Sequence, residues 1–174
     1  HKSMKRFVRI NNTLHEDGIE HILSIFSVFK KERDVEYVHS DIDQCKQLEE
    51  YDIRLLAGLE LGLNQVLNGE YDANLYATYE AKPHVDAAFY NFTIGFVAAG
   101  DFWGFTGNHR RCCSLVPGAI YLLNNQAKHG AEPKNGVCKE NRLVFATIDF
   151  PAQDMVDALQ LLGLDRSAVM PFSG

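Results

Sequence analysis

The chain has 174 residues, of which 46% are hydrophobic and 23% charged, so it can bury a core without disulfides and is neither disordered nor fibrous in composition. Its net charge of −6 disfavours a broad nucleic-acid-binding face, although the run NHRRCC at 108–113 concentrates positive charge. No apolar run reaches the ~20 residues of a membrane span, and no signal peptide is recognised. The four cysteines form no CxxC motif, which favours a reduced, intracellular and most simply cytoplasmic protein.

The first 70 residues are expected to form a mostly helical support. Polar and apolar side chains alternate along residues 5–10, which predicts a first strand. Residues 15–32 place apolar side chains at helical spacing behind an acidic start, which predicts a helix. The two-residue period of 34–42 predicts a strand, and a second, longer helix is expected over roughly 43–67, ended by Asn68 and Gly69.

From residue 71 onward, short apolar segments alternate with glycine- and proline-containing turns, as in an antiparallel sandwich or barrel. The expected strands lie at 73–81, 84–98, 100–107, 112–118, 119–125, 128–133 and 141–150. A last helix is expected over about 151–163, with Pro151 in its first turn. Helices followed by a continuous block of strands indicate an α+β chain built around a β-sandwich.

The strand block contains a set of residues suited to a metal. His84 and Asp86 are two residues apart, so one strand can point both to the same side. His129 lies at the end of a later strand, and two histidines with one carboxylate are the facial ligand set of non-haem Fe(II) oxygenases. Arg142, at the head of the last strand, offers a planar fork for a carboxylate.

These motifs carry a resemblance to a known family. In order and spacing, HVD at 84–86, KHGAEP at 128–133 and NRLVF at 141–145 resemble the catalytic core of the Fe(II)/2-oxoglutarate-dependent oxygenases. The resemblance covers residues 76–150 and implies a double-stranded β-helix, or jelly-roll. We therefore expect one domain over 4–174, with the helical support at about 13–69, the jelly-roll at about 71–150 and the carboxy-terminal helix at about 151–163.

The resemblance also implies an activity, the oxidation of a C–H bond with O₂ and 2-oxoglutarate, which releases succinate and CO₂. Fe(II) would be held by His84, Asp86 and His129. The far carboxylate of 2-oxoglutarate would pair with Arg142. Phenol groups could assist in binding the co-substrate, and a substrate could contact the loop arginines or the aromatic side chains near the barrel mouth. The candidates are Tyr76, Tyr79 and Tyr90 for the co-substrate, and Trp103, Phe105, Arg110 and Arg111 for the substrate.

Alternative functions remain open at this point. The alkylated-base demethylases carry an asparagine and a second arginine where this chain has apolar residues after Arg142, so a nucleobase substrate is not favoured. Cupin-like enzymes share the fold but normally carry His-x-His and a glutamate, and HVD differs from that triplet. A non-catalytic binding module would not need all three ligands. The substrate, a protein side chain, a small metabolite or a nucleobase, is left open, and no membrane partner is expected.

Overall fold

The computed structural model describes residues 5–33, 43–57 and 61–172. The amino-terminal elements are β1 (Phe7–Thr13), α1 (Glu16–Arg33), β2 (Asp43–Gln47), α2 (Glu50–Ala57) and α3 (Asn64–Leu67). The strand block comprises β3 (Asp72–Thr78), β4 (Ala81–His84), β5 (Phe92–Ala99), β6 (Phe102–Thr106), β7 (Arg110–Leu115), β8 (Ala119–Asn124), β9 (His129–Pro133) and β10 (Leu143–Phe150). Helix α4 (Met155–Leu161) and a 3₁₀ turn (Arg166–Ala168) follow. None of the described helices is long and apolar enough to cross a membrane.

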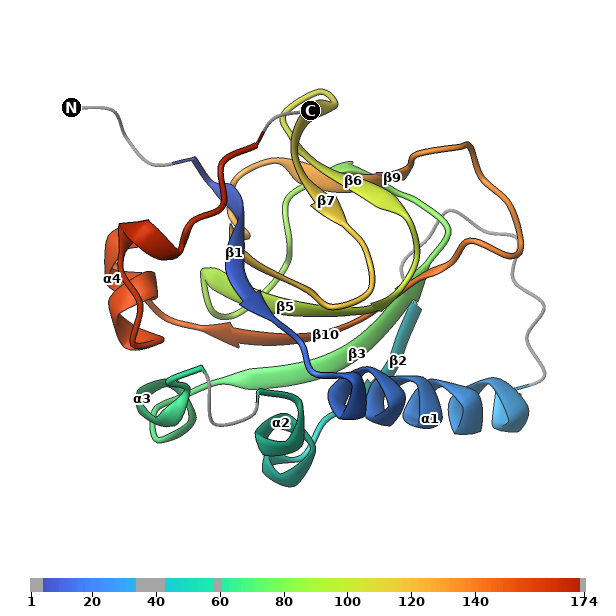
Figure 1. The fold of residues 1–174 in the computed structure, drawn as a ribbon, viewed down its shortest axis with the longest axis horizontal. Helices are drawn as coiled ribbons and strands as arrows, with labels where there is room; N and C mark the ends of the chain where they lie inside the picture. The colour runs from blue at the N-terminus through green and yellow to red at the C-terminus, as the bar shows by residue number, and fades with distance from the viewer. Residues whose placement is uncertain (1–4, 34–42, 58–60, 173–174) are drawn as a thin grey trace.

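Two antiparallel sheets face each other and form the expected jelly-roll. The larger sheet has the order β1-β8-β5-β10-β3-β2, and the smaller has the order β4-β9-β6-β7. Figure 1 shows α1 and α2 on the outer side of the larger sheet and the smaller sheet on its inner side. The larger sheet is therefore covered on both faces, by helices on one and by the second sheet on the other.

The alternation of side chains along β10 assigns its two faces to different environments. One set of alternate residues joins the apolar cluster under the helices, and the other set faces the space between the sheets. Outward residues are Val144, Ala146 and Ile148, and inward residues are Leu143, Phe145, Thr147 and Asp149. Strand β3, paired with β10, follows the same rule, with Leu75 and Ala77 outward and Asp72, Asn74, Tyr76 and Thr78 inward.

The prediction of a single long helix over 43–67 is wrong. Residues 43–47 form β2 instead, which pairs with β3 and becomes the edge of the larger sheet, and Leu48 N continues the contact by donating to Ala73 O at 2.8 Å. The helical part is divided into α2 and α3, and between them Gly62 packs so closely that a Cβ would lie 3.0 Å from Leu162 O. Pairing with the sheet and contact with the carboxy-terminal segment thus outweigh local helix propensity. The strand expected over 34–42 lies outside the described residues.

Two further boundaries differ from expectation. The strand expected over 84–98 is divided, because β4 ends at His84 and β5 begins only at Phe92. The last helix begins at Met155 rather than near Pro151, because the Asp154 side chain accepts a hydrogen bond from Asp157 N at 2.8 Å and caps the helix. The remaining expected strands and the first helix match the structure within a few residues.

One close contact inside the larger sheet gives a stability prediction. Gly95 is paired with Tyr121 on β8, and a Cβ at position 95 would lie 2.0 Å from the Tyr121 ring. We expect Gly95→Ala to displace that ring and to lower the free energy of unfolding by about 1–3 kcal/mol, as overpacking does, measured by chemical denaturation. Gly69→Ala is the matched control, since its Cβ would make only ordinary contacts of 3.5 Å or more. Equal stability of the two variants would contradict this packing.

Candidate metal centre and adjoining cavity

Strand pairing brings the two histidines of the expected metal site together. His84, the last residue of β4, lies directly opposite His129, the first residue of β9, in the antiparallel register. Their ring centroids are 4.5 Å apart. Residues distant in the sequence thus converge because the smaller sheet pairs β4 with β9.

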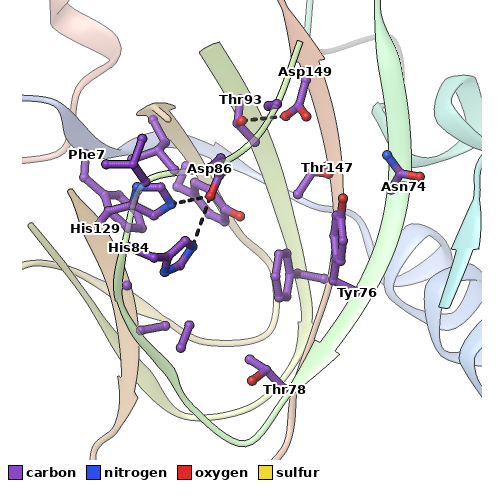
Figure 2. Close-up of a pocket in the computed structure, with 18 of the residues that line it drawn as sticks. Phe7, Asn74, Tyr76, Thr78, His84, Asp86, Thr93, His129, Thr147 and Asp149 are labelled. Atoms are coloured by element: carbon purple, nitrogen blue, oxygen red, sulfur yellow. Dashed lines mark hydrogen bonds and ion pairs between the residues drawn. The ribbon is translucent and has the colours of Figure 1, made fainter. Parts of the chain in front are cut away.

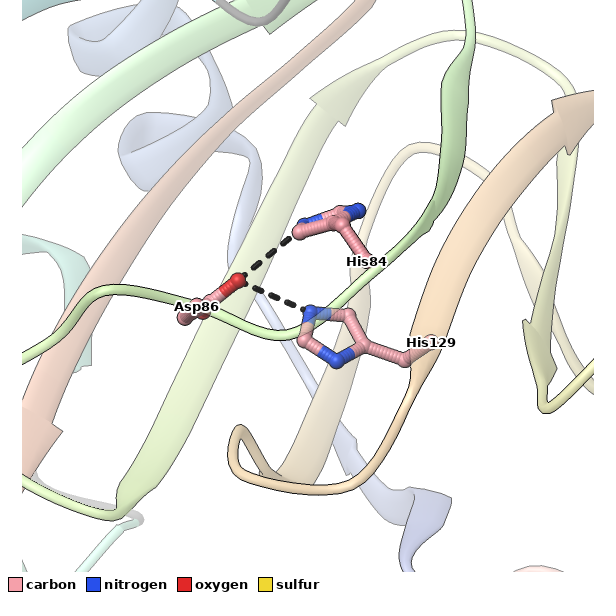
Figure 3. Close-up of side chains that lie close together, drawn as sticks. All are labelled: His84, Asp86 and His129. Atoms are coloured by element: carbon pink, nitrogen blue, oxygen red, sulfur yellow. Dashed lines mark ion pairs between the residues drawn. The ribbon is translucent and has the colours of Figure 1, made fainter.

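Asp86 joins the histidines from an irregular segment rather than from a strand. Its backbone N donates to Asn125 O at 3.1 Å, and Gln126 Nε2 donates to its backbone O at 3.3 Å. These bonds tie the segment after β4 to the turn between β8 and β9. Figure 3 shows the result: Asp86 Oδ1 lies 3.0 Å from Nε2 of both His84 and His129.

The hydrogen bonds of the histidines leave their Nε2 atoms available as ligands. His84 Nδ1 lies 2.6 Å from Lys82 O, and His129 Nδ1 lies 2.7 Å from Ala127 O. A carbonyl oxygen can only accept, so each Nδ1 carries a hydrogen. Each Nε2 faces Asp86 Oδ1 in this structure and would present its lone pair to a metal after losing its own hydrogen. Metal-binding histidines are commonly oriented in this way.

The charge distribution of the triad also suits a cation. Burial opposes the charged form of Asp86, but its contacts with His129 and His84 prevail and lower its pKa to about 2. Contact with Asp86 raises the pKa of His84, against the effect of burial. The ligand atoms of the three residues all lie within 4.8 Å of one another. Two nitrogen lone pairs and one carboxylate facing a common point form a donor set that fits Fe(II) or another divalent transition metal.

The triad lies in the wall of a cavity of about 690 Å³ between the two sheets. The His129 side chain is only 7% exposed, whereas His84 and Asp86 are 32% and 30% exposed, so the centre is held from one side and open on the other. The apolar part of the wall includes Phe7, Leu115, Leu123, Leu143 and Phe145. None of the described residues that line the cavity is a lysine or an arginine.

Polar side chains gather on the inner face of the larger sheet, at the start of β3, the end of β10 and the start of β5 (Figure 2). Thr93 donates its hydroxyl hydrogen to Asp149 Oδ1 at 2.5 Å and accepts from Asn125 Nδ2 at 3.0 Å. Asp149 stands opposite Asp72 in the register of β10 and β3. Burial raises the pKa of Asp149 to about 6, and the negative charges of Asp86 and Asp72 act in the same direction, against the Thr93 hydrogen bond.

Arg142 is not placed to anchor a co-substrate in this cavity. Its guanidinium lies 4.3 Å from the centroid of the Tyr79 ring and 5.6 Å from that of Phe26 on α1, and Arg142 does not line the cavity. The expected pairing of Arg142 with a co-substrate carboxylate stays a prediction that the lining of this cavity does not support, and the next residues of the same phase, Val144 and Ala146, also face away from the cavity. These two residues belong to the helix-covered face, because the inward set along β10 is the odd-numbered one.

The three tyrosines proposed to bind the co-substrate lie in different environments. Tyr76 lines the cavity and stacks on Phe145, with ring centroids 5.6 Å apart. Burial raises the pKa of Tyr76 to about 12, helped by Asp149 and Asp86, so its hydroxyl is a neutral hydrogen-bond donor at pH 7. Tyr79 lies under Arg142, and Tyr90 packs edge-on against Phe89; neither lines the cavity.

The four residues considered as substrate contacts also lie outside the cavity. Trp103 is on the outer side of the smaller sheet. Its ring centroid lies 4.4 Å from Lys134 Nζ and 5.1 Å from the Arg111 guanidinium carbon. Phe105 is fully buried, and Arg110 is exposed in the same sheet. Arg111 pairs with Glu132 at 3.3 Å. Their placement indicates packing and surface roles.

The polar end of the cavity was not predicted from the sequence. Its residues occupy alternate positions in YDANLYAT (71–78) and FATIDF (145–150), a two-residue period that was available in the sequence. Such alternation usually marks a solvent-facing side, and only the helices over the opposite face show that the polar side faces inward. Asn125, whose side chain connects the metal segment to Thr93, carried no local signal at all.

The environment of Asp149 gives a prediction on stability and pH. Because its pKa is raised from 3.8 to about 6, the folded state binds its proton more tightly than the unfolded state does. Asp149 therefore leaves the free energy of unfolding unchanged below pH 3.8. It lowers that free energy as the pH rises to about 6, and above this pH the reduction stays constant at up to about 3 kcal/mol. Asp149→Asn, which keeps the acceptor for Thr93, should raise the free energy of unfolding at pH 7 but not at pH 3.5, in denaturant titrations. Asp17→Asn, on the exposed start of α1, is the control; equal effects of the two variants at pH 7 would contradict the assignment.

Comparisons with known proteins agree with the fold. No protein-family model and no curated protein sequence matches the chain. AviO1 from Streptomyces viridochromogenes aligns with a TM-score of 0.52 and 11% identity over 88% of this chain and 97% of that chain. The non-haem monooxygenase ThoJ, in a nickel complex, also aligns with a TM-score of 0.52 and 11% identity, over 97% of this chain and 84% of that chain. A cupin-2 domain containing protein from Shewanella frigidimarina aligns with a TM-score of 0.39 and 11% identity, over 74% of this chain and 98% of that chain. At this identity the first two likenesses establish a shared jelly-roll fold.

Proposed function

We propose that this protein is an Fe(II)-dependent oxygenase in which His84, Asp86 and His129 hold the metal and the adjoining cavity holds the substrate. The observation that carries the proposal is the convergence of the three ligands, with both histidine Nδ1 hydrogens committed to backbone carbonyls. A bound Fe(II) would supply the one-electron chemistry that activates O₂. ThoJ, named as a non-haem monooxygenase, is a protein in which this fold accompanies such chemistry.

The residues of this chain would contribute positioning and the exclusion of water. The edge of Phe7 packs against His129, with ring centroids 6.4 Å apart, and limits the orientation of that ligand. Burial raises the pKa of Tyr121 well above its ordinary value, so its hydroxyl stays protonated inside the cavity. The apolar wall lowers the local dielectric and strengthens polar contacts to a bound substrate.

A 2-oxoglutarate co-substrate is the finer form of the proposal. Hydroxylation of a C–H bond by O₂ places one oxygen atom in the product, and decarboxylation of 2-oxoglutarate supplies two electrons and takes the second atom into succinate. The order of His84, Asp86, His129 and Arg142 favours this form. The described cavity does not fit the far carboxylate, because it presents Asp72 and Asp149 and no lysine or arginine. We therefore assign no residue to 2-oxoglutarate.

The first test concerns the metal. We expect purified protein to bind one Fe(II), or Mn(II) as a probe, and His84→Ala, Asp86→Ala or His129→Ala each to weaken binding by at least about a hundredfold in calorimetric titration. Each change removes one of three donors and, for Asp86, the negative charge. Circular dichroism should show intact folds.

The control is His15→Ala, because His15 also faces an aspartate, with its Nδ1 3.7 Å from Asp17 Oδ2, but lies on the surface of the chain far from the triad in sequence. This variant should bind metal as the wild type does. Wild-type affinity in all three folded triad variants would reject the metal centre. Metal binding without any uptake of O₂, across amine, alcohol and carboxylate substrates, would instead indicate a non-catalytic binding module.

The second test concerns 2-oxoglutarate. Because Arg142 lies on the face away from the cavity, Arg142→Ala should leave the 2-oxoglutarate dependence of succinate release within about twofold of the wild type, measured without added substrate. A tenfold or larger increase, about 1.4 kcal/mol, would show that Arg142 reaches the co-substrate after all. No succinate release by the wild-type protein would remove 2-oxoglutarate from the proposal. The protein would then be an oxygenase that takes both oxygen atoms into its substrate, or one that reduces the second oxygen atom to water with two electrons from another reductant.

A further inference from the structure

We propose that the polar end of the cavity, formed by Asp72, Asn74, Thr147 and Asp149, binds the protonated amine of the substrate, whose apolar body extends toward the metal centre. The identity of this ligand as a substrate rests on the proposed oxygenase function. The presence of an amine-binding site does not, since it depends only on the geometry and charge of this end of the cavity.

The first argument is the pair of carboxylates. Asp149 and Asp72 are directly opposed on neighbouring strands and project from the same face of the sheet. Like charges in this position destabilise a sheet. Both side chains are only partly buried, so a ligand can reach them from the cavity. A monovalent cation held between the two would convert the repulsion into attraction.

The second argument is a buried polar atom that lacks a partner. Thr147, between Phe145 and Asp149 on the inner face of β10, is 4% exposed and lines the cavity. Its Oγ1 is buried and makes no hydrogen bond within the described part of the chain. Figure 2 shows the Thr147 side chain on the cavity side of β10, below Asp149. An unsatisfied buried hydroxyl costs free energy. Because this oxygen is covered, a rotation of the Thr147 side chain about χ1 would bring it to the cavity, where an ammonium group could donate to it.

The third argument is the charge balance of the cavity. Three carboxylates line it, those of Asp72, Asp86 and Asp149, while the described lining residues include no lysine or arginine. His84 and His129 both face Asp86 and so do not compensate the other two carboxylates. A divalent metal at the triad would neutralise Asp86 and leave one positive charge against the other two carboxylates, so the cavity would still be negative overall. The polar end thus keeps its negative charge for a ligand.

The remaining walls define the body of the ligand. Tyr76 and Phe145 stack beside the polar end, and Leu123 and Phe7 line the way to His129. Aromatic faces next to an ammonium group add cation–π attraction. A cavity of about 690 Å³ is large enough for a small organic molecule but not for a folded partner. The chemical class that fits is therefore an amine with an aromatic or aliphatic body.

The test uses 2-phenylethylamine and tryptamine as probes, with 2-phenylethanol and tryptophol as neutral counterparts and 3-phenylpropionate as an anion. Binding is measured by ligand-observed NMR on metal-free protein at pH 7.5. We expect the amines to bind at least about tenfold more tightly than their neutral counterparts, and the anion not to bind. Asp149→Asn and Asp72→Asn should each reduce amine affinity by about tenfold or more, and leave alcohol binding within about twofold.

The stability of Asp149→Asn separates loss of the site from loss of the fold, because this variant is expected to be more stable than the wild type at this pH. Asp17→Asn makes the same change of net charge outside the cavity and should bind amines normally. With Mn(II) at the triad, the protons of the probe farthest from nitrogen should be broadened most. Equal affinity for amines and alcohols, or amine binding that survives both cavity variants, would overturn the inference.

The outcomes also separate this inference from the oxygenase. Amine binding without metal binding or O₂ uptake would leave the amine site in place and reject the proposed function. Metal-dependent O₂ uptake with a substrate that carries no positive charge, and no amine binding, would keep the function and reject the amine site. Selective binding of 3-phenylpropionate would also reject the amine site, and would favour a carboxylate ligand such as 2-oxoglutarate.

Discussion

The hydrogen bonds of one buried residue, Asn125, connect the two ends of the cavity. Its backbone O accepts from Asp86 N at 3.1 Å and so positions the carboxylate of the triad. Its side-chain Nδ2 donates to Tyr90 O at 2.8 Å and to Thr93 Oγ1 at 3.0 Å, and Thr93 in turn donates to Asp149. Asn125 is 0% exposed, so these bonds form where water cannot replace them. The irregular segment between β4 and β5, which no strand ladder holds, takes its course from this turn.

The helices determine what the larger sheet can offer on its inner face. Because α1 and α2 bury the outward residues of β3 and β10, much of the apolar core lies outside the barrel. The inward residues are therefore released from core packing, and β3 and β10 can present carboxylates, an amide and hydroxyls to a cavity. Opposed carboxylates reduce stability, and such departures from good packing are typical of functional sites. The outer core compensates for them.

The placement of positive charge is what distinguishes this cavity from the one that the family resemblance implies. Side chains alternate along a strand, so a difference of one residue in phase turns a side chain from one face to the other. Near the start of β10, where the register with β5 is irregular, Leu143 and Phe145 face inward and Arg142 lies over Tyr79 and Phe26 instead. The three residues that the resemblance assigns to a metal thus converge, whereas Arg142 lies toward the helix-covered side of the larger sheet. Asp149 and Asp72 then give the interior a negative character.

The sequence by itself determined the jelly-roll, the first helix and the three residues that converge, because period-two strands, turn residues and the HVD and distal histidine motifs are local signals. It did not determine the division of 43–67, the irregular course of 85–91 or the direction of Arg142. These depend on the pairing of β2 with β3, on the turn at Asn125 and on the phase of β10, all of which involve contacts between residues far apart in the chain. The polar alternation of 71–78 was visible in the sequence, but its meaning depended on which face the helices cover. Only the tertiary structure decides that, because alternation specifies two faces and not which of them is buried.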